Sequence, residues 1–328
     1  MKNLTRKEAE KICDEIFDKK YTDEEIAEIL ICIAKKGETE EEIAGFSDSL
    51  LKHAEPFPYR EDVFDICGTG GSTVERFNVS TVVAFILASI GVKVAKHGNR
   101  GSHRPNGSFD FLEELGINID VDGYVLSECL EKTNLAFIFA RKFHPAMKMV
   151  AKARKIVDHR TIFNLAGPIS NPANIKKQVV GTADKNMVDL LVKTGRLIGR
   201  EECLVVSGHP GIDEISVSGI SIVGGSQTTI REITPEQIDT PRYDYDKIPC
   251  GDAKFNAQEF YKLINNSANN GLEDIVCVNA GLALAFFKKS NFIIEDIKDG
   301  IRESRDAIRL GWMRKKFEEY KKAVKGIK

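Results

Sequence analysis

Apolar and polar positions follow one pattern in the first 55 residues and another in the rest of the chain. Over residues 1–55, isoleucine and leucine recur at intervals near three and four, and no run is strand-like. Thr22 and Thr39 each open a Thr-x-x-Glu sequence, which is typical of the residue that caps the start of a helix. The pattern predicts a small helical unit at the N-terminus.

From about residue 59 onward, short apolar runs bounded by glycine alternate with helical stretches. Helical periodicity covers 80–90 and 185–198, and the strand-like runs lie at 63–67, 92–96, 135–140, 178–182 and 203–208. Strands that alternate with helices indicate a parallel or mixed sheet flanked by helices. The segment 216–233 is typical of an antiparallel hairpin, and the last third of the chain returns to helices.

The predicted fold class is therefore α/β, with a helical N-terminal domain and a larger α/β domain. We expect the helical domain to span residues 1–58 and the α/β domain to span 59–328, with a mixed, mostly parallel central sheet. Neither an internal repeat nor a low-complexity linker separates the two parts, so we expect them to be closely associated.

Composition limits the partners. The chain has 328 residues, is 42% hydrophobic and carries a formal net charge of −2, so it is long enough for a large core. A nearly neutral surface offers no general attraction for nucleic acid or for an anionic membrane. The first residues carry charges throughout and contain no apolar block, so we expect neither a signal peptide nor a membrane anchor.

The cysteines indicate a reducing compartment. They are scattered singly, without a Cys-x-x-Cys pair or a close Cys/His spacing, at positions 13, 32, 67, 129, 203, 250 and 277. This distribution argues against structural zinc and against a disulfide framework. We therefore expect a soluble, cytoplasmic protein.

A glycine-rich run at 65–81 reads as a strand, a turn and the start of a helix. Backbone N–H groups of such a turn and the positive end of a helix dipole attract phosphate. The spacing matches neither a P-loop nor a dinucleotide-binding fingerprint. Asn78 or Ser80 is available to cap the helix. The alternative is a sharp turn that needs glycine only for its backbone conformation.

A second run, Lys-His-Gly-Asn-Arg at 96–100, follows the next predicted strand. Lys96 therefore lies at the end of a strand, where ligands of open α/β sheets collect. Its ammonium group suits a phosphate, whereas His97 and Asn99 offer directional hydrogen bonds to a second, planar ligand.

Two adjacent carboxylates, Asp213 and Glu214, follow the strand at 203–208 in a turn bounded by glycine and proline. Carboxylates are hard oxygen ligands suited to Mg²⁺, which also takes oxygens from substrate phosphates. A solvated acidic turn is the alternative, and two neighbouring phosphate-binding loops favour the metal.

With these motifs the chain resembles the anthranilate phosphoribosyltransferase family, within the wider group that includes pyrimidine nucleoside phosphorylases. The Lys-His-Gly-Asn-Arg sequence at 96–100 distinguishes the chain from the phosphorylases, which have a Lys-Ser-Gly-Arg pattern at the corresponding place. The matching segments occur in the family's order over nearly the whole chain, at 36–46, 68–81, 96–100, 107–116, 143–148, 160–173 and 211–216.

The resemblance implies an enzyme of tryptophan biosynthesis that transfers a 5-phosphoribosyl group from phosphoribosyl pyrophosphate to the amine of anthranilate and releases pyrophosphate. It also implies Mg²⁺ as cofactor and a homodimer formed through the helical domain. In the family, a helical segment that here would lie near 172–195 packs with the N-terminal helices as part of that domain.

The resemblance assigns residues to the two substrates and the metal. Lys96 and Arg154 would be catalytic, and Ser80, Asp213 and Glu214 would hold Mg²⁺. The acceptor would meet Gly68, His97, Asn99, His144 and Arg154, the last offering its guanidinium to the carboxylate. The donor would meet Gly68, Thr69, Gly71, Ser72, Arg76, Asn78, Ser80, Thr81, Lys96 and Ser108.

The donor loops depart from the family pattern. An Asp-Gly pair and a Thr before Phe77 are typical, and this chain has Ser72, Thr73 and Arg76 instead. A Ser- and Lys-rich loop is replaced by a sequence that contains His103, Arg104 and Pro105. Arg76 and Arg104 could restore positive charge, but a planar guanidinium differs in geometry from an ammonium.

These departures leave alternatives open. A paralogous phosphoribosyltransferase could use another aromatic amine or base, and a nucleoside phosphorylase would use inorganic phosphate. A non-catalytic relative that binds nucleic acid or a protein would need a basic stripe and eroded metal ligands, whereas Asp213 and Glu214 are intact and the charge is balanced.

Overall fold

The N-terminal unit consists of three helices in a computed structural model that describes residues 2–101 and 105–326. The helices are α1 (Arg6–Phe17), α2 (Asp23–Lys36) and α3 (Glu40–Lys52). Thr5, Thr22 and Thr39 cap them, and each threonine forms a reciprocal capping box with a glutamate three residues later. The predicted helix starts at Thr22 and Thr39 are confirmed, and α1 has a third start of the same kind.

The remainder is built around one seven-stranded sheet of order β3-β2-β1-β4-β5-β6-β7. The first five strands in this order are parallel, and β6 and β7 are antiparallel. The predicted mixed, mostly parallel sheet is confirmed, as is antiparallel pairing within 216–233. The strands are β1 (Val63–Gly68), β2 (Val94–Gly98), β3 (Leu135–Phe139), β4 (Ile175–Gly181), β5 (Glu202–Gly208), β6 (Ser221–Gly225) and β7 (Glu232–Ile233).

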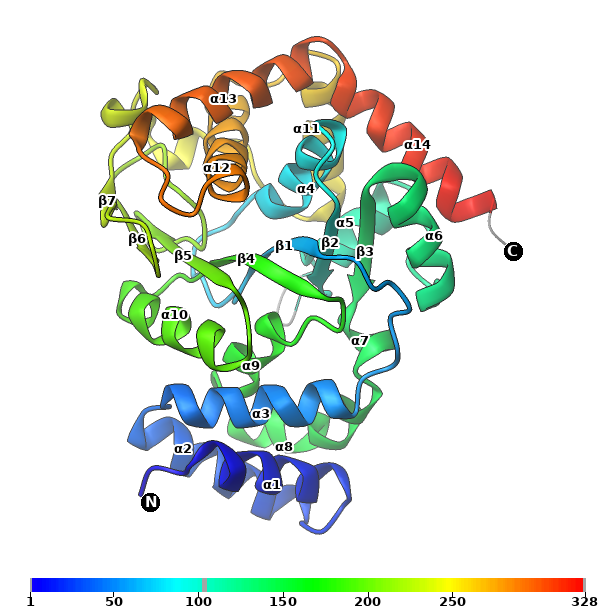
Figure 1. Cartoon of the computed structure of the whole chain (residues 1–328), viewed down its shortest axis with the longest axis vertical. Coiled ribbons are helices and arrows are strands. Elements are labelled where there is room, and N and C mark those ends of the chain that lie inside the picture. The colour runs from blue at the N-terminus through cyan, green and yellow to red at the C-terminus, as the bar shows by residue number, and fades with distance from the viewer. Residues whose placement is uncertain (1, 102–104, 327–328) are drawn as a thin grey trace.

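Helices cover both faces of the sheet (Figure 1). One face carries α4, α12 and α13, and the other carries α9 and α10, beyond which α1 to α3 and α8 lie. The helices after α3 are α4 (Val79–Ser89), α5 (Ser108–Glu114), α6 (Gly123–Thr133), α7 (Ala140–Phe143), α8 (Ala151–Val157), α9 (Phe163–Ile169), α10 (Val188–Leu197), α11 (Ala253–Ile264), α12 (Asn270–Lys288), α13 (Ile294–Arg309) and α14 (Trp312–Gly326). Short 3₁₀ helices lie at Pro145–Val150, Lys185–Met187, Glu236–Ile238 and Tyr245–Lys247.

Two apolar clusters stabilise these layers. The larger lies between the sheet and the helices α4, α6 and α11 to α14. The smaller joins α1 to α3 with α8, α9 and α10, and includes Phe46, Phe163 and Leu191, each at most 3% exposed. The N-terminal helices therefore share a core with helices from the middle of the chain.

The segment 172–195 differs from the expected helical connection. Its first half is β4, a central strand hydrogen-bonded to β1 and β5, and only the second half is helical, from Lys185 onward. The last four residues of β4 are fully buried, which is usual for a strand with parallel neighbours on both sides. The contacts with the N-terminal helices are made by α8 and α9, which precede β4 in the sequence, and by α10, which follows it.

Helix α12 is largely buried within the larger cluster. Among the described residues it is the helix whose length and apolar composition would allow it to cross a membrane, and 83% of its apolar window is buried within the protein. Gly281 of α12 and Gly300 of α13 let the two backbones approach closely. A Cβ atom on Gly281 would lie 2.7 Å from the nitrogen of Ile301 and 3.0 Å from the carbonyl oxygen of Ile297.

We predict that Gly281→Ala lowers the free energy of unfolding by about 1–3 kcal/mol, because an added methyl group meets backbone that has no room to move. Urea unfolding followed by circular dichroism measures the change. Gly326→Ala is the matched control, since a Cβ atom there meets nothing within 4 Å. Equal unfolding midpoints for wild type and Gly281→Ala would contradict the close packing of α12 on α13.

Candidate active site

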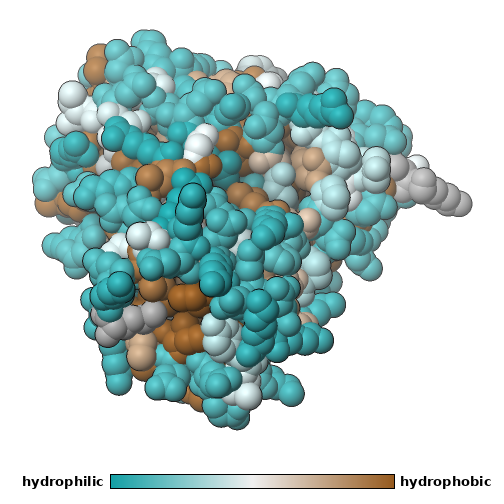
Figure 2. Space-filling model, turned by 60° about the horizontal axis from the view of Figure 1, so that its bottom comes forward, coloured by the Kyte–Doolittle hydropathy of each residue, from teal (hydrophilic) through white to brown (hydrophobic). Residues whose placement is uncertain are grey.

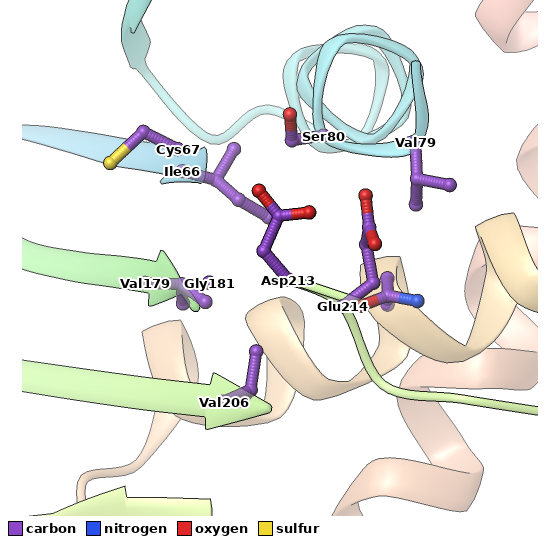
Figure 3. Close-up of a pocket in the computed structure, with 10 residues that line it drawn as sticks. Ile66, Cys67, Val79, Ser80, Val179, Gly181, Val206, Asp213 and Glu214 are labelled. Atoms are coloured by element: carbon purple, nitrogen blue, oxygen red, sulfur yellow. The ribbon is translucent and has the colours of Figure 1, made fainter. Parts of the chain in front are cut away.

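The carboxyl ends of four adjacent strands, β2, β1, β4 and β5, bring the sequence motifs together. The glycine-rich loop leaves β1, the Lys-His-Gly-Asn-Arg segment ends β2, and the turn with Asp213 and Glu214 follows β5. Ligands of open α/β sheets bind at this edge. Figure 3 shows the carboxylates of Asp213 and Glu214 pointing toward the first turn of α4, where Ser80 lies.

The glycine-rich loop makes a sharp turn after β1. Gly70 and Gly71 have φ angles of +67° and +80°, which residues with a side chain rarely adopt. The loop leads into α4, whose N-terminus faces the same pocket through Val79 and Ser80. The turn needs glycine for its backbone conformation, as one alternative expected. The same turn also directs the loop toward the start of α4, as an anion-binding loop requires.

The carboxylate turn lies directly over the ends of β1 and β4. A Cβ atom on Gly68 would lie 2.9 Å from Cγ of Asp213, and a Cβ atom on Gly181 would lie 2.6 Å from its backbone carbon. Glycine at both strand ends is therefore required for Asp213 to reach this position. Gly181 was not among the expected site residues, and nothing in its local sequence distinguishes it.

Glu214 is buried beside Asp213, with 8% of its surface exposed. Burial raises the pKa of Glu214, and the nearby positive charge of Arg76 opposes that rise. The following residue, Ile215, is fixed by Asn279 of α12, whose side chain accepts a hydrogen bond from the Ile215 N–H at 2.8 Å and donates one to its carbonyl at 2.9 Å. Asn279 is a further residue of the pocket that sequence reasoning missed.

The glycine-rich loop and the carboxylate turn contact each other directly. The Gly70 N–H donates to Oδ2 of Asp213 at 3.2 Å, and the Ser72 hydroxyl donates to the Gly211 carbonyl at 2.8 Å. Arg76 forms an ion pair through Nη1 with Oδ1 of Asp213. Three contacts therefore connect the two loops at the place where the metal was expected.

Asn78 does not cap α4, although it occupies the cap position. Within residues 2–101 and 105–326, no side-chain hydrogen bond caps this helix. Instead the Asn78 amide donates to the Asn106 carbonyl at 3.1 Å and accepts from Asn256 of α11 at 3.0 Å. Asn78 and Asn256 thus tie the start of α4 to the loop before α5, which explains why the amide is not available to the helix.

Lys96 lies within β2 and not at its end as expected, because the strand continues to Gly98. Its side chain is buried, 3% exposed, next to a buried carboxylate, Asp65 of β1. Burial lowers the pKa of Lys96, and attraction to Asp65 opposes that effect. Asp65 accepts hydrogen bonds from the His97 N–H at 3.1 Å and from the Gln178 amide at 2.8 Å. The Arg200 guanidinium donates to the Gln178 side chain at 3.4 Å. These polar residues behind Lys96 were not expected from the sequence.

His97 and His144 form a buried pair whose ring centroids lie 5.2 Å apart at an interplanar angle of 62°. Burial lowers the pKa of both imidazoles, that of His97 well below its usual value, so both are neutral at pH 7. Nε2 of each ring is buried without a hydrogen-bond partner among the described residues. A nitrogen of each ring can therefore exchange a hydrogen bond with a bound molecule.

Arg154 lies on α8, in the helical layer below the sheet. Its guanidinium donates to Oδ1 of Asn164 at 3.3 Å, and burial lowers its pKa. No carboxylate among the described residues forms an ion pair with it, and its hydrogen-bond partner Asn164 is neutral. A half-buried guanidinium without a counter-ion is suited to the carboxylate of a ligand.

The loop between β2 and α5 is described in part. Asn99 and Ser108 flank it, with the Ser108 hydroxyl donating to the Asn99 carbonyl at 3.1 Å. The Pro105 carbonyl accepts from the N–H of Ala253 at the start of α11, 3.3 Å away. His103 and Arg104 lie outside the described residues.

The residues of the pocket fit a magnesium ion. Asp213 and Glu214 supply carboxylates and Ser80 a hydroxyl at one pocket. The hydroxyl groups of Thr69 and Thr81 are buried and have no hydrogen-bond partner in the described part of the chain. In the described part of the chain, no group of three or more His, Cys, Asp and Glu side chains is arranged so that it could hold a metal ion. A site with few protein carboxylates is what Mg²⁺ uses when substrate phosphates and water complete its shell.

Two family models match the chain. One, described as the a/b domain of a glycosyl transferase family, covers residues 60–313, and the other, described as the helical bundle domain of that family, covers residues 1–54. The two matches together span most of the chain.

Curated relatives agree. The anthranilate phosphoribosyltransferase of Oceanobacillus iheyensis is 37% identical over 314 residues, which are 94% of this chain and 91% of the relative. The anthranilate phosphoribosyltransferase of Persephonella marina is 36% identical over 312 residues, with the same coverage of 94% and 91%.

Solved structures have the same fold. The anthranilate phosphoribosyltransferase of Thermus thermophilus superposes with a TM-score of 0.88 at 29% identity, covering 99% of this chain and 97% of that one. The enzyme of Saccharomyces cerevisiae, solved with phosphoribosyl pyrophosphate and Mg, gives a TM-score of 0.88 at 23% identity over 99% and 94% of the two chains. The resemblance of the motifs is thus confirmed, and the chain belongs to the glycosyl transferase family of these models, among the anthranilate phosphoribosyltransferases.

Proposed function

We propose that this protein transfers the 5-phosphoribosyl group of phosphoribosyl pyrophosphate to the amine of anthranilate in tryptophan biosynthesis, with release of pyrophosphate. The observation that carries the proposal is the convergence, at one sheet edge, of a glycine-rich loop, the buried cation Lys96 and the carboxylates of Asp213 and Glu214. The curated relatives bear the name of this activity over 94% of the chain.

The donor side of the site is the edge formed by β1, β2 and the start of α4. We assign to the phosphoribosyl pyrophosphate the backbone and side chains of the glycine-rich loop, the first turn of α4, and the cation and hydroxyl of the second loop: Gly68, Thr69, Gly71, Ser72, Arg76, Ser80, Thr81, Lys96 and Ser108. Asn78 belongs to this side as a residue that shapes the loop, because its amide is already bonded to Asn106 and Asn256.

The reaction breaks the bond between C1 of the ribose and an oxygen of pyrophosphate. The electron pair leaves with pyrophosphate, C1 acquires oxocarbenium character, and the lone pair of the anthranilate nitrogen forms the new C1–N bond before a proton is lost. Mg²⁺ held by Ser80, Asp213 and Glu214 would neutralise charge on the leaving group. Lys96 and the loop amides would stabilise the same developing charge.

The acceptor side lies toward the helical layer. We assign Gly68, His97, Asn99, His144 and Arg154 to anthranilate, with Arg154 on its carboxylate and the neutral rings of His97 and His144 beside its ring. An aromatic amine is a neutral nucleophile that needs no strong base, so binding in the correct orientation supplies much of the rate. The neutral imidazoles favour a single orientation of anthranilate. A protonated imidazole would attract the carboxylate and so compete with Arg154 for it.

We further propose that residues 1–58 form a helical domain that packs on helices α8 to α10, and that the α/β domain of residues 59–328 carries donor binding and catalysis. We also propose that the protein is a cytoplasmic homodimer. The shared apolar cluster of α1 to α3 with α8, α9 and α10 supports the helical unit. Figure 2 shows apolar residues gathered in the lower part of the face that these helices present. Partly buried apolar residues of this cluster include Leu4, Ile29 and Ile31.

The proposed reaction is tested by pyrophosphate release from phosphoribosyl pyrophosphate, with and without anthranilate and Mg²⁺. We expect release that depends on both, with loss of anthranilate fluorescence in parallel. Lys96→Ala should lower kcat/KM for the donor by about 100-fold, because a buried cation facing the leaving group is removed. Pyrophosphate release with another aromatic amine but not with anthranilate would contradict the assigned acceptor. If neither anthranilate nor any other aromatic amine led to release, the transfer reaction itself would be contradicted.

Arg154→Ala should raise the KM for anthranilate by about tenfold or more while changing kcat little, because a guanidinium–carboxylate contact is lost in the ground state and transition state alike. Steady-state kinetics at saturating donor measures both constants. Lys155→Ala, on the same helix and exposed to solvent, is the matched control. An unchanged KM in Arg154→Ala would show that the acceptor carboxylate binds elsewhere.

A further inference from the structure

Arg76 contacts the carboxylate that the proposed function assigns to Mg²⁺. Its Nη1 atom pairs with Oδ1 of Asp213, while Oδ2 of the same carboxylate accepts the Gly70 N–H at 3.2 Å. Oδ1 therefore has Arg76 as an ion-pair partner but is buried without a hydrogen bond among the described residues, whereas Oδ2 is hydrogen-bonded. The side chain of Asp213 is 6% exposed and that of Arg76 is 24% exposed, so the guanidinium covers the carboxylate from the solvent side.

The backbone of Arg76 is held in place independently of this ion pair. Its carbonyl accepts hydrogen bonds from the side-chain amides of Asn106, at 2.9 Å, and Asn256, at 3.1 Å. The Asn256 amide also donates to the side-chain oxygens of Asn78 and Asn106, and the Asn78 amide donates to the Asn106 backbone carbonyl. These bonds fix the chain just before α4. The guanidinium can consequently leave Asp213 by side-chain rotation while the loop that carries it stays anchored.

Electrostatics defines what Arg76 does at this position. Asp213 and Glu214 are adjacent and mostly buried, so two negative charges without a cation would repel each other at low dielectric. The charge of Arg76 acts on both carboxylates. A divalent ion that takes Oδ1 of Asp213 as a ligand cannot share this oxygen with a guanidinium, because the two cations would repel each other at contact distance.

We infer that Arg76 is an internal counter-ion of Asp213 that occupies the metal carboxylate in the free protein and is displaced when the metal ion enters together with the donor. The released guanidinium then lies beside the pyrophosphate of the donor, where it adds a positive charge. The inference rests on the proposed function for the identity of the metal and the donor. It assigns Arg76 a role in making metal binding and donor binding mutually dependent.

The thermodynamic consequence is reciprocal coupling. Displacing Arg76 costs free energy when the metal binds alone, and contact of the released guanidinium with pyrophosphate returns part of it when both bind. The free protein should therefore bind a divalent ion weakly, and pyrophosphate should strengthen that binding. Removing the charge of Arg76 should strengthen metal binding to the free protein and reduce the effect of pyrophosphate.

The test is Mn²⁺ binding to the full chain, followed by electron paramagnetic resonance of free Mn²⁺, without and with inorganic pyrophosphate in amounts corrected for its own complex with Mn²⁺. We expect Arg76→Gln and Arg76→Thr to bind Mn²⁺ about tenfold more tightly than wild type in the absence of pyrophosphate. Pyrophosphate should then increase Mn²⁺ affinity less in the variants than in wild type. Arg242→Gln is the control, since it removes an equal charge from an exposed ion pair with Glu236.

Two results would overturn the inference, and they differ in what else they affect. Equal or weaker Mn²⁺ affinity in both folded Arg76 variants would show that Arg76 does not compete with the metal, and would leave the transferase assignment standing. Absence of Mn²⁺ binding in wild type and variants, with or without pyrophosphate, would overturn the inference together with the metal assignment of the proposed function. Thermal unfolding of each variant shows whether it is folded, and the two neutral replacements differ in size, so one misfolded variant leaves the other as the test.

Discussion

The close approach of Asp213 to the ends of β1 and β4 is the constraint on which the rest of the site depends. A side chain at Gly68 or Gly181 would occupy the space of Asp213, so both strands must end in glycine. With Asp213 in this place, the turn after β5 meets the loop after β1 through Gly70 and Ser72. A carboxylate is thus held where two strands, a glycine-rich turn and the start of α4 converge.

The charges around this carboxylate divide the site into two sides. Toward β2, the buried Lys96 lies beside Asp65, whose negative charge opposes the lowering of the Lys96 pKa by burial. Toward the helical layer, His97 and His144 are neutral and Arg154 pairs with no carboxylate among the described residues. In the proposed function, an anionic donor and a carboxylate-bearing aromatic acceptor would each find complementary chemistry on one of these sides.

Sequence predicted the elements well because local periodicity and capping determine them: the Thr22 and Thr39 helix starts and the alternation of strands and helices are confirmed. It also placed the loop motifs, because glycine turns and paired carboxylates are local features. It could not supply Gly181, Asp65, Asn279 or the ion pair of Arg76 with Asp213, since these depend on the strand order β2-β1-β4-β5, which joins segments more than 100 residues apart. The helical connection expected near 172–195 came from the resemblance, whereas the strand-like run at 178–182 correctly indicated β4.

The central claim is that the metal of the donor binds at Asp213 and Glu214, with Arg76 released. The most direct measurement is a crystal structure of the protein with Mn²⁺ and phosphoribosyl pyrophosphate, in which anomalous scattering locates the manganese. The account predicts an anomalous peak within coordination distance of the Asp213 or Glu214 carboxylate, with the Arg76 guanidinium turned from Asp213 to a phosphate oxygen. A donor complex in which the metal lies away from both carboxylates, or in which Arg76 still pairs with Asp213, would contradict it.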